Sequence, residues 1–516
     1  MAVILEEPLL SLVGPLRYSR GGFDRHPRVG IPLELIPPAV RNMLQRLEVN
    51  RAVGFLLLSR GWQFLSGIFT VVLMTSCLDE RTQGVYQLFL SLVGMQLFVE
   101  LGLPGIVSLL TSHEWSRLEF DSAGRIVGDL VALGRLASIY RFASRWFAVG
   151  VVLFLVGVCA SGYYKISGGE VTAHWLAPWV ALVAINAIAL PFAPRLAMLE
   201  GCHQVATINY FRLLQAVSGT LVVWAVLYFG GGLWALSASS AVKWGWEFYL
   251  VRVRYRSAFV SLSQSPPTDT GIIIREIWPL LWRSAIQAIG LYFCTCYFTI
   301  VVSSTHGTDE TGMIEAGRFG LTWGILQLMH AVALSWVNSR MPEFGSLAAR
   351  GEHDQLRRRL IKTGLISIAV FLAGAGAFVL AVLGLVQVKF KYASRFLDLT
   401  STSLLVVGLA FILLATVLQV SVRLYKQDPF LLPNLVTSIA VAILAWKAGE
   451  RWGSSGVGLA YVVAAGVWSL PVSAFLAWRN QRHLAQAPQP RASETQFEPQ
   501  TSSGPAESGS ATSHSS

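Results

Sequence analysis

The feature that most constrains this chain is a series of apolar blocks, each about 20 residues long, separated by short stretches rich in arginine. A block of that length is what an α-helix needs to cross the hydrocarbon core of a bilayer. Only 13% of the residues are charged and 53% are hydrophobic, whereas a soluble domain carries roughly 25% charge. These values exclude a soluble enzyme and predict an all-α polytopic membrane protein.

Counting the blocks gives about 12 transmembrane helices. Proline or glycine residues blur the ends of the fourth and fifth blocks, and the eleventh block is short. The predicted spans are residues 53–75, 84–111, 145–163, 175–194, 212–229, 232–251, 278–304, 316–338, 364–388, 401–422, 430–446 and 455–478.

The positive charges predict the orientation of these spans. Of the 40 lysines and arginines, 29 fall in the two ends of the chain and in the loops after even-numbered spans, 7 in the other loops and 4 within spans. Because Lys and Arg accumulate on the cytoplasmic side of a membrane, both termini are predicted to be cytoplasmic. The net charge of +11 is scattered over many loops. We therefore interpret it as a sign of topology and predict no nucleic-acid partner.

The chain divides into five predicted parts. Within the first part, residues 38–52 have the pattern of an amphipathic helix on the inner membrane surface or, alternatively, of a solvated helical start to the first span. The last part is rich in Pro, Ser, Gln and Thr without an apolar period, which is typical of disorder. The parts are a cytoplasmic N-terminal segment (1–52), two six-helix lobes (53–251 and 278–480), a cytoplasmic linker between them (252–277) and a cytoplasmic tail (481–516).

Two short patterns occur twice, at equivalent places of a six-plus-six division. The first span contains Leu-Leu-x-Arg ending at Arg60, with a glycine seven residues later, and the seventh span contains the same pattern ending at Arg283. The second and eighth spans begin alike at Gly84 and Gly317, with an aromatic residue two positions later and a leucine four positions later. Since an even number of spans separates the copies, the lobes would be related by a parallel pseudo-two-fold axis along the membrane normal, with a substrate path between them.

Three further segments carry a resemblance to a known family. They are Gly84-x-Tyr86-x-Leu88-x-x-Ser91-Leu92 followed by Glu100-Leu101-Gly102-Leu103, then Glu200-Gly201-x-x-Gln204-x-x-x-x-Asn209, and Pro342-Glu343-Phe344-Gly345-Ser346-Leu347 with Ala349-Arg350-Gly351-Glu352. With these segments the chain resembles the polysaccharide-flippase branch of the multidrug/oligosaccharidyl-lipid/polysaccharide exporter superfamily, over about residues 53–480. The long N-terminal segment departs from that family.

This resemblance implies a bacterial inner-membrane protein with two V-shaped lobes. It implies that the protein moves a lipid-pyrophosphate-linked glycan from the inner to the outer leaflet by alternating access. It also implies that the partners are this glycan, membrane lipid and other polysaccharide-assembly membrane proteins.

Two arginines inside the spans are candidate substrate ligands. A charge at mid-bilayer costs at least about 2.5 to 3.5 kcal/mol on insertion scales, so it needs a partner, a wet cavity or a route to the surface. Arg60 and Arg283 lie near the inner ends of their spans, where each could simply extend its side chain to the interface. Their repeat-related positions favour a second interpretation, in which they face each other and bind a pyrophosphate. Flippases of the superfamily are similar in having basic residues on the first helices of both lobes.

Four other ionisable residues within the spans are candidates for a site. Lys243 and Glu247 are four residues apart on one helix face, where they could form a self-satisfied pair or bind substrate. Glu100, in the second span, is a candidate partner of Arg60 or a coupling group for protons or cations. His330, in the eighth span, is either a hydrogen-bonded interior histidine or a proton carrier. Arg318, near the outer end of its span, is predicted to be an interface anchor.

Enzyme chemistry finds no support in the sequence. There is no P-loop pattern, no zinc motif and no disulfide framework among the five cysteines. The predicted outer loops are also too short to form a catalytic domain, which argues against a polysaccharide polymerase. The sequence thus predicts a transporter without a cofactor. Its interpretations are a lipid-linked oligosaccharide flippase, a cation-coupled multidrug or metabolite antiporter, or a flippase for a peptidoglycan-precursor lipid.

Overall fold

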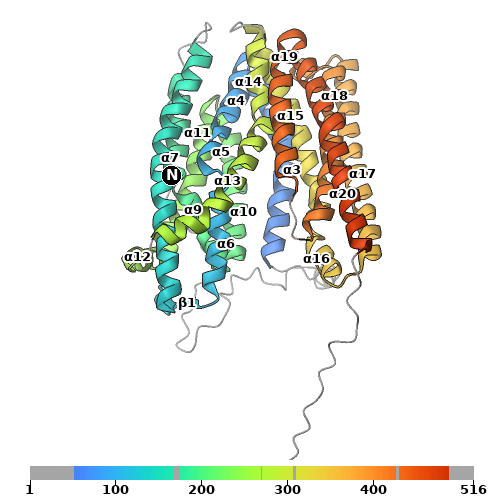
Figure 1. The fold of residues 1–516 in the computed structure, drawn as a ribbon. Coiled ribbons are helices and arrows are strands. Elements are labelled where there is room, and N and C mark those ends of the chain that lie inside the picture. The colour runs from blue at the N-terminus through green and yellow to red at the C-terminus, as the bar shows by residue number, and fades with distance from the viewer. Residues whose placement is uncertain (1–50, 168–174, 269, 306–309, 426–428, 487–516) are drawn as a thin grey trace, which may run out of the picture.

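The computed structural model describes residues 51–167, 175–268, 270–305, 310–425 and 429–486. Most of the predicted N-terminal amphipathic helix and most of the predicted tail lie outside these residues. The described chain is almost entirely helical, and its long helices run side by side (Figure 1). The predicted all-α polytopic class is confirmed.

The first half of the chain forms helices and one small hairpin. Its elements are α3 (Arg51–Cys77), α4 (Glu80–Val93), η2 (Gly94–Gln96), α5 (Leu97–Glu100), α6 (Leu103–Trp115), β1 (Leu118–Phe120), β2 (Ile126–Gly128), α7 (Leu130–Ser167), α8 (Leu176–Ala189), α9 (Phe192–Gly201), α10 (Val205–Tyr228), α11 (Trp234–Phe248), η3 (Tyr249–Arg254) and α12 (Arg256–Gln264). We call α3 to α12 the first lobe.

The second half is helical throughout its described residues. Its elements are α13 (Thr270–Thr295), α14 (Tyr297–Thr305), α15 (Glu310–Asn338), α16 (Met341–Ala349), α17 (His353–Gln387), η4 (Ala393–Arg395), α18 (Leu399–Arg423), α19 (Leu431–Val463), η5 (Ala464–Ser469) and α20 (Leu470–Gln486). We call α13 to α20 the second lobe. The predicted linker is largely helical, because it contains α12 and the start of α13.

Breaks in the helices lie both within the predicted spans and between them. Leu101 and Gly102 both have positive φ, so the α4–α6 span bends by 43°. Gly453 (φ 56°) interrupts α19 between the eleventh and twelfth predicted spans. Within the described residues, seven helices are long and apolar enough to cross a membrane, or nine if two bent pairs each count as one span. The number twelve stays a prediction.

The β1–β2 hairpin is an exception to the all-α pattern. Leu118 pairs with Gly128 in antiparallel register, and the Asp121 side chain accepts hydrogen bonds from the backbone N–H groups of Ala123 (2.9 Å) and Arg125 (2.7 Å). A short polar side chain that bonds to its own turn is a recognised turn signal. The hairpin, α12 and α16 lie at the lower end of Figure 1, which the charge distribution predicts to be inner.

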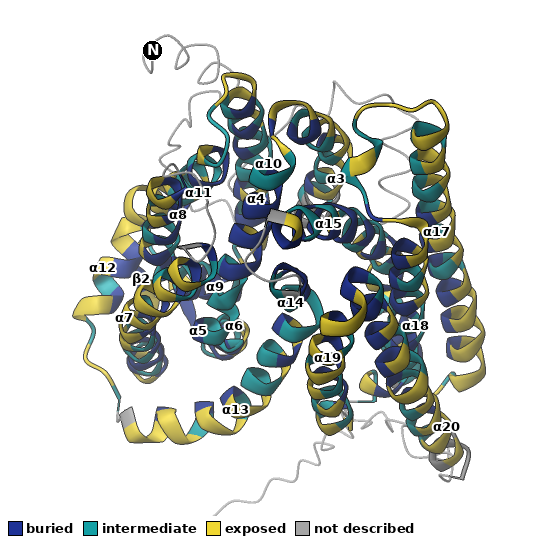
Figure 2. Cartoon of the chain, turned by 90° about the horizontal axis from the view of Figure 1, so that it is seen from above, coloured by how far each residue is buried: buried dark blue, intermediate teal, exposed yellow. Residues whose placement is uncertain are grey.

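Apolar side chains occupy both the inside and the outside of the bundle. The two main groups of buried apolar residues belong mostly to α3–α13 and to α14–α19, respectively. In Figure 2 the exposed residues lie on the outer surfaces, while α4, α14 and α15 occupy the centre. The exposed surfaces include large apolar residues such as Leu153 and Leu380, which are 66% and 70% exposed. Such extensive apolar surface fits contact with lipid.

The two glycines matched by the internal repeat lie against each other, where α4 crosses α15. A Cβ atom on Gly317 would come within 2.8 Å of the Gly84 backbone nitrogen. Next to this crossing, the buried Gln83 side chain donates a hydrogen bond to the Gly317 carbonyl oxygen (3.2 Å). The missing side chains thus permit the close helix approach that joins the lobes at the predicted outer end.

Candidate functional site

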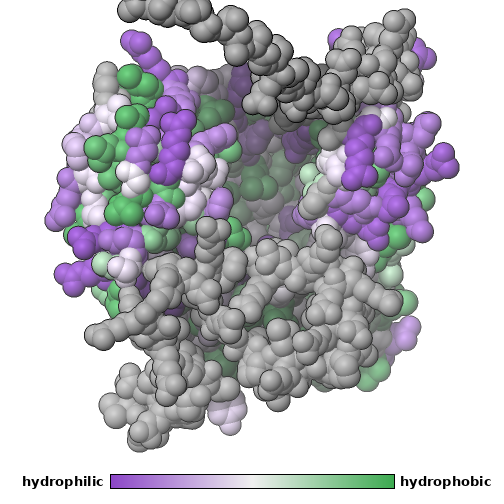
Figure 3. Space-filling view, turned by 90° about the horizontal axis from the view of Figure 1, so that it is seen from below, coloured by the Kyte–Doolittle hydropathy of each residue, from purple (hydrophilic) through white to green (hydrophobic). Residues whose placement is uncertain are grey.

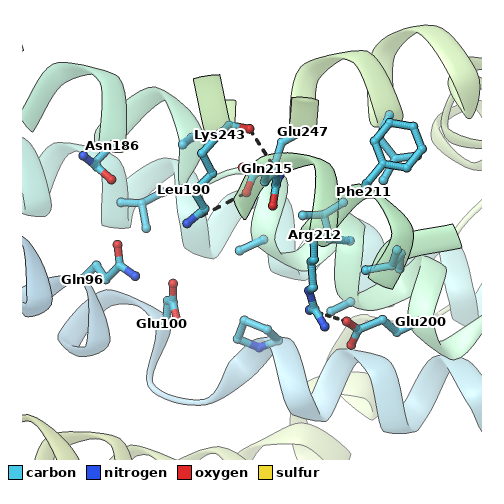
Figure 4. Close-up of a pocket in the computed structure, with 17 residues that line it drawn as sticks. Gln96, Glu100, Asn186, Leu190, Glu200, Phe211, Arg212, Gln215, Lys243 and Glu247 are labelled. Atoms are coloured by element: carbon cyan, nitrogen blue, oxygen red, sulfur yellow. Dashed lines mark hydrogen bonds and ion pairs between the residues drawn. The ribbon is translucent and has the colours of Figure 1, made fainter. Parts of the chain in front are cut away.

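A pocket of about 250 Å³ lies within the first lobe, among α5, α8, α9, α10 and α11. We call it the charged pocket, because three carboxylates and two basic groups line it (Figure 4). Its polar lining residues are Gln96, Glu100, Asn186, Glu200, Arg212, Gln215, Lys243 and Glu247.

The predicted pairing of Lys243 with Glu247 is present on one face of α11. The Lys243 ammonium lies 4.0 Å from a Glu247 carboxylate oxygen. The Glu247 side chain is only 8% exposed, whereas that of Lys243 is 54% exposed. Gln215 of α10 donates a hydrogen bond to the Lys243 carbonyl oxygen (3.3 Å). The buried carboxylate therefore has its counter-ion at the edge of the open space.

Glu100 reaches the charged pocket because its helix ends there. It is the last residue of α5, and the positive φ angles of the next two residues turn the chain away. Figure 4 shows its carboxylate and the Lys243 ammonium pointing toward one another, and the two groups interact electrostatically. No ion pair joins Glu100 to Arg60 within the described residues, so Glu100 associates with the Lys243–Glu247 pair instead.

A second ion pair closes another side of the pocket. Arg212 of α10 lies 2.5 Å from a carboxylate oxygen of Glu200 on α9, and it also donates a hydrogen bond to Asn209 (3.4 Å). Our sequence reasoning missed this pair as part of the site. Glu200 and Asn209 did belong to the segment that carries the family resemblance, and Arg212 begins a predicted span, so a signal was present.

The charged pocket can therefore hold and exchange charge inside an apolar bundle. With all groups ionised, its five charged side chains carry one more negative than positive charge. Protonation of one carboxylate, or entry of one cation, would balance them. Buried charges of this kind are costly unless they are paired, and in membrane proteins they mark ion and proton pathways.

The two candidate arginines make local contacts only. Arg60 donates a hydrogen bond to Gln63, one turn further along α3 (3.2 Å). The Arg283 guanidinium lies 5.5 Å from the ring centre of its neighbour Trp282. Within the described residues neither arginine has a carboxylate partner, and no contact joins them. Their joint binding of a pyrophosphate stays a prediction.

His330 lies outside the charged pocket. It is 9% exposed on α15, and its ring meets that of Phe371 edge-on at 6.0 Å. Its Nε2 atom has no hydrogen-bond partner within the described residues. The structure therefore places this histidine in the packing between α15 and α17.

An ion-pair cluster joins the lobes at the predicted outer end. The Glu80 carboxylate lies 3.1 Å from the Arg318 guanidinium and 3.9 Å from that of Arg395. Arg395 also donates a hydrogen bond to the Leu78 carbonyl oxygen (2.8 Å), and Ser394 donates one to Glu80 (3.0 Å). We call Glu80, Arg318 and Arg395 the outer cluster. Arg318 pairs across the lobes, and its predicted place at the membrane interface stays a prediction.

The opposite end of the molecule is hollowed. Seen from below, the surface recedes between two groups of hydrophilic side chains, and apolar residues line part of the hollow (Figure 3). The structure is therefore joined at the predicted outer end and hollowed at the predicted inner end.

Solved structures share this architecture. An inward-facing multidrug resistance MATE transporter of the MOP superfamily aligns with a TM-score of 0.59 and 12% identity, over 83% of this chain and 95% of the other. The chain shares the fold of this transporter. The MATE multidrug transporter DinF-BH aligns with a TM-score of 0.55 and 14% identity, over 87% of this chain and 98% of the other. An outward-facing MATE transporter aligns with a TM-score of 0.51 and 13% identity, over 86% of this chain and 99% of the other.

The shared fold thus rests on structure alone. No protein-family model and no curated protein sequence matches the chain. The fold agrees with the superfamily that the sequence resembles, and it leaves the polysaccharide-flippase branch a prediction.

Proposed function

We propose that this protein is an alternating-access transporter that moves a lipid-linked oligosaccharide or polysaccharide repeat unit across the bacterial inner membrane. The observation that carries the proposal is the difference between the two ends of the MOP fold. The outer cluster and the Gly84–Gly317 crossing join the lobes at one end, while the other end is hollowed. A substrate path that opens to one side at a time requires this difference. The TM-score is also higher for the inward-facing neighbour (0.59) than for the outward-facing one (0.51), which supports an inward-facing state.

The unpaired arginines support an anionic substrate. Lys243 and Arg318 each have a carboxylate partner in the structure, whereas Arg60 and Arg283 have none within the described residues. A guanidinium without a counter-ion is available to a ligand, and its planar fork suits phosphate oxygens. A lipid-linked glycan would supply a pyrophosphate to these two groups and leave its lipid tail in the membrane.

The test is flipping of a lipid-linked sugar by the purified protein in vesicles. Replacing Arg60 or Arg283 by Ala should lower the rate about tenfold or more, because one charge-assisted contact is lost. Replacing either by Lys should restore the rate only in part, since Lys keeps the charge and loses the fork. Arg451→Ala, at an exposed arginine of a predicted outer loop, is the control and should leave the rate unchanged. An unchanged rate in the Arg60→Ala/Arg283→Ala double variant would refute the anionic site.

A cation-coupled antiporter is the second candidate, and the charged pocket favours it. Three carboxylates against two basic groups suit a proton or a cation better than an anion. An antiporter would transport a cationic dye in exchange for protons that move down their gradient, with no lipid-linked sugar present. A flippase would not. Flipping of a peptidoglycan precursor, the third candidate, needs the same arginines and is separated from the first by competition between the two lipid-linked glycans.

A further inference from the structure

A second pocket lies at the predicted inner end of the second lobe, far from the charged pocket in the chain. It has a volume of about 360 Å³ and is lined by Arg340, Arg359, Lys362, Thr363 and Ile366. We call it the inner basic pocket. Three of its five lining residues are cationic, and neither the proposed transport path nor the charged pocket includes any of them.

The sequence spacing explains how this pocket forms. Arg359, Lys362 and Ile366 recur at intervals of three and four residues, so they share one face of α17. Arg340 approaches that face from the turn between α15 and α16. Thr363, beside them, is 3% exposed and contributes a buried hydroxyl to the wall. The arrangement is a cationic rim around a polar wall.

One carboxylate serves two of the three cations. Glu343 of α16 forms ion pairs with Arg359 and with Arg340, the latter at 3.6 Å. Lys362 has no ion-pair partner within the described residues. The pocket and its carboxylate therefore carry two net positive charges, and Glu343 holds both guanidinium groups on one side.

A basic residue near the start of α7, in the first lobe, offers a comparison. Arg135, near the start of α7, lies between two carboxylates, at 2.9 Å from Glu114 and 2.7 Å from Glu276. One cation there has two carboxylates, whereas in the second lobe three cations share one. The carboxylates thus outnumber the cation at Arg135, whereas the second-lobe pocket is short of negative charge.

The depth of the pocket indicates which anionic group could supply the missing negative charge. Lys362 precedes the predicted ninth span by two residues and Arg359 by five, which is roughly 3 and 8 Å at 1.5 Å per residue. Ile366 lies just inside the span. Cations at this level face the phosphate groups of the membrane surface, where basic residues attract anionic headgroups. We propose that the inner basic pocket binds a phosphate group at the inner membrane surface, through Arg340, Arg359 and Lys362.

Two probes distinguish a lipid headgroup from a free phosphate. The full chain in neutral detergent is titrated with phosphatidylglycerol, with phosphatidylcholine as the uncharged reference, and occupancy is read by native mass spectrometry. In the second arm it is titrated with inorganic pyrophosphate by calorimetry. Lys362→Gln is the main variant, because it removes a cation whose loss leaves no carboxylate unpaired. The Arg359→Gln/Lys362→Gln double variant removes two.

The control is Arg357→Gln. Arg357 is exposed, and two residues before Arg359 it lies on the opposite side of α17. We expect Lys362→Gln to weaken one of the two probes, the double variant to weaken the same probe about tenfold or more, and the control to leave both unchanged. Weakening of phosphatidylglycerol alone identifies a lipid headgroup, and weakening of pyrophosphate identifies a soluble or substrate phosphate. The proposal is overturned if the double variant changes neither probe, or if Arg357→Gln weakens them equally.

Discussion

The two lobes of this protein share an architecture and differ in chemistry at the same depth. In the first lobe, α9, α10 and α11 bring two ion pairs into the charged pocket. In the second lobe, α18, α19 and α20 bring together uncharged groups. There the Gln419 amide donates hydrogen bonds to Asn434 and Ser473, both at 3.2 Å. An asparagine lies near the start of the fifth span and of the eleventh, Asn209 and Asn434.

This difference teaches that the internal repeat preserves backbone geometry more closely than side-chain chemistry. The matched glycines Gly84 and Gly317 are kept where two helices must touch. The polar clusters inside each lobe do not lie at such a close approach of two helices, so their side chains can differ. A hydrogen-bonded amide holds three helices together without changing charge, whereas a carboxylate pair can also gain or lose a proton. We therefore expect coupling to reside in the first lobe alone.

The largest expected effect is on transport when the charged pocket loses a carboxylate. Glu247→Gln keeps the shape of the side chain but can neither release a proton nor bind a cation, so transport into vesicles under a pH gradient should fall about tenfold or more. Gln419→Ala, at the matched depth of the second lobe, removes only neutral hydrogen bonds and should change the rate by about twofold or less. Equal losses in the two variants would contradict the division of roles between the lobes.

Sequence reasoning predicted the part of this comparison that depends on local spacing. The Lys243–Glu247 pair follows from a separation of four residues on one helix, and the unusual depth of Glu100 marked it as a candidate. The repeat also marked Gly84 and Gly317 as equivalent positions, although it predicted no contact between them. Each of these features depends on a short segment of chain, or on two segments with a common pattern.

The missed features depend on long-range geometry. Glu200 meets Arg212 because the chain turns between α9 and α10, where His203 adopts a positive φ of 61° that its residue type does not predict. The outer cluster joins Glu80, Arg318 and Arg395, which come from three distant segments. Charge counting could assign all three to the predicted outer end and could not pair them.

The second prediction concerns the stability that the ion pair of the charged pocket contributes. Lys243→Met leaves the buried Glu247 carboxylate without its counter-ion, which should cost about 1 to 3 kcal/mol and lower the midpoint of thermal unfolding in detergent. Adding Glu247→Leu removes the orphaned charge, so the double variant should recover much of the loss while remaining inactive. If the double variant melts no higher than Lys243→Met, the pair is not the source of the instability.

The smallest expected effect is on the balance between the two ends of the molecule. Glu80→Gln weakens the ion pairs of the outer cluster, and because these groups are partly exposed, each pair contributes only about 0.2 to 1 kcal/mol. The population open at the outer end should therefore rise by a factor of about two to thirty. Spin labels at Ser116 and Ser346, both exposed at the predicted inner end, would report this rise as a larger fraction of short distances.

The matched control for the outer cluster is Asp398→Asn. Asp398 lies at the same end and accepts a hydrogen bond from the Ser401 backbone N–H (3.0 Å) at the start of α18, within one lobe. Its replacement weakens a helix start without releasing one lobe from the other, so the distance distribution should stay unchanged. A shift as large as that of Glu80→Gln would mean that general loosening of the outer end, rather than the ion pairs between the lobes, sets the balance.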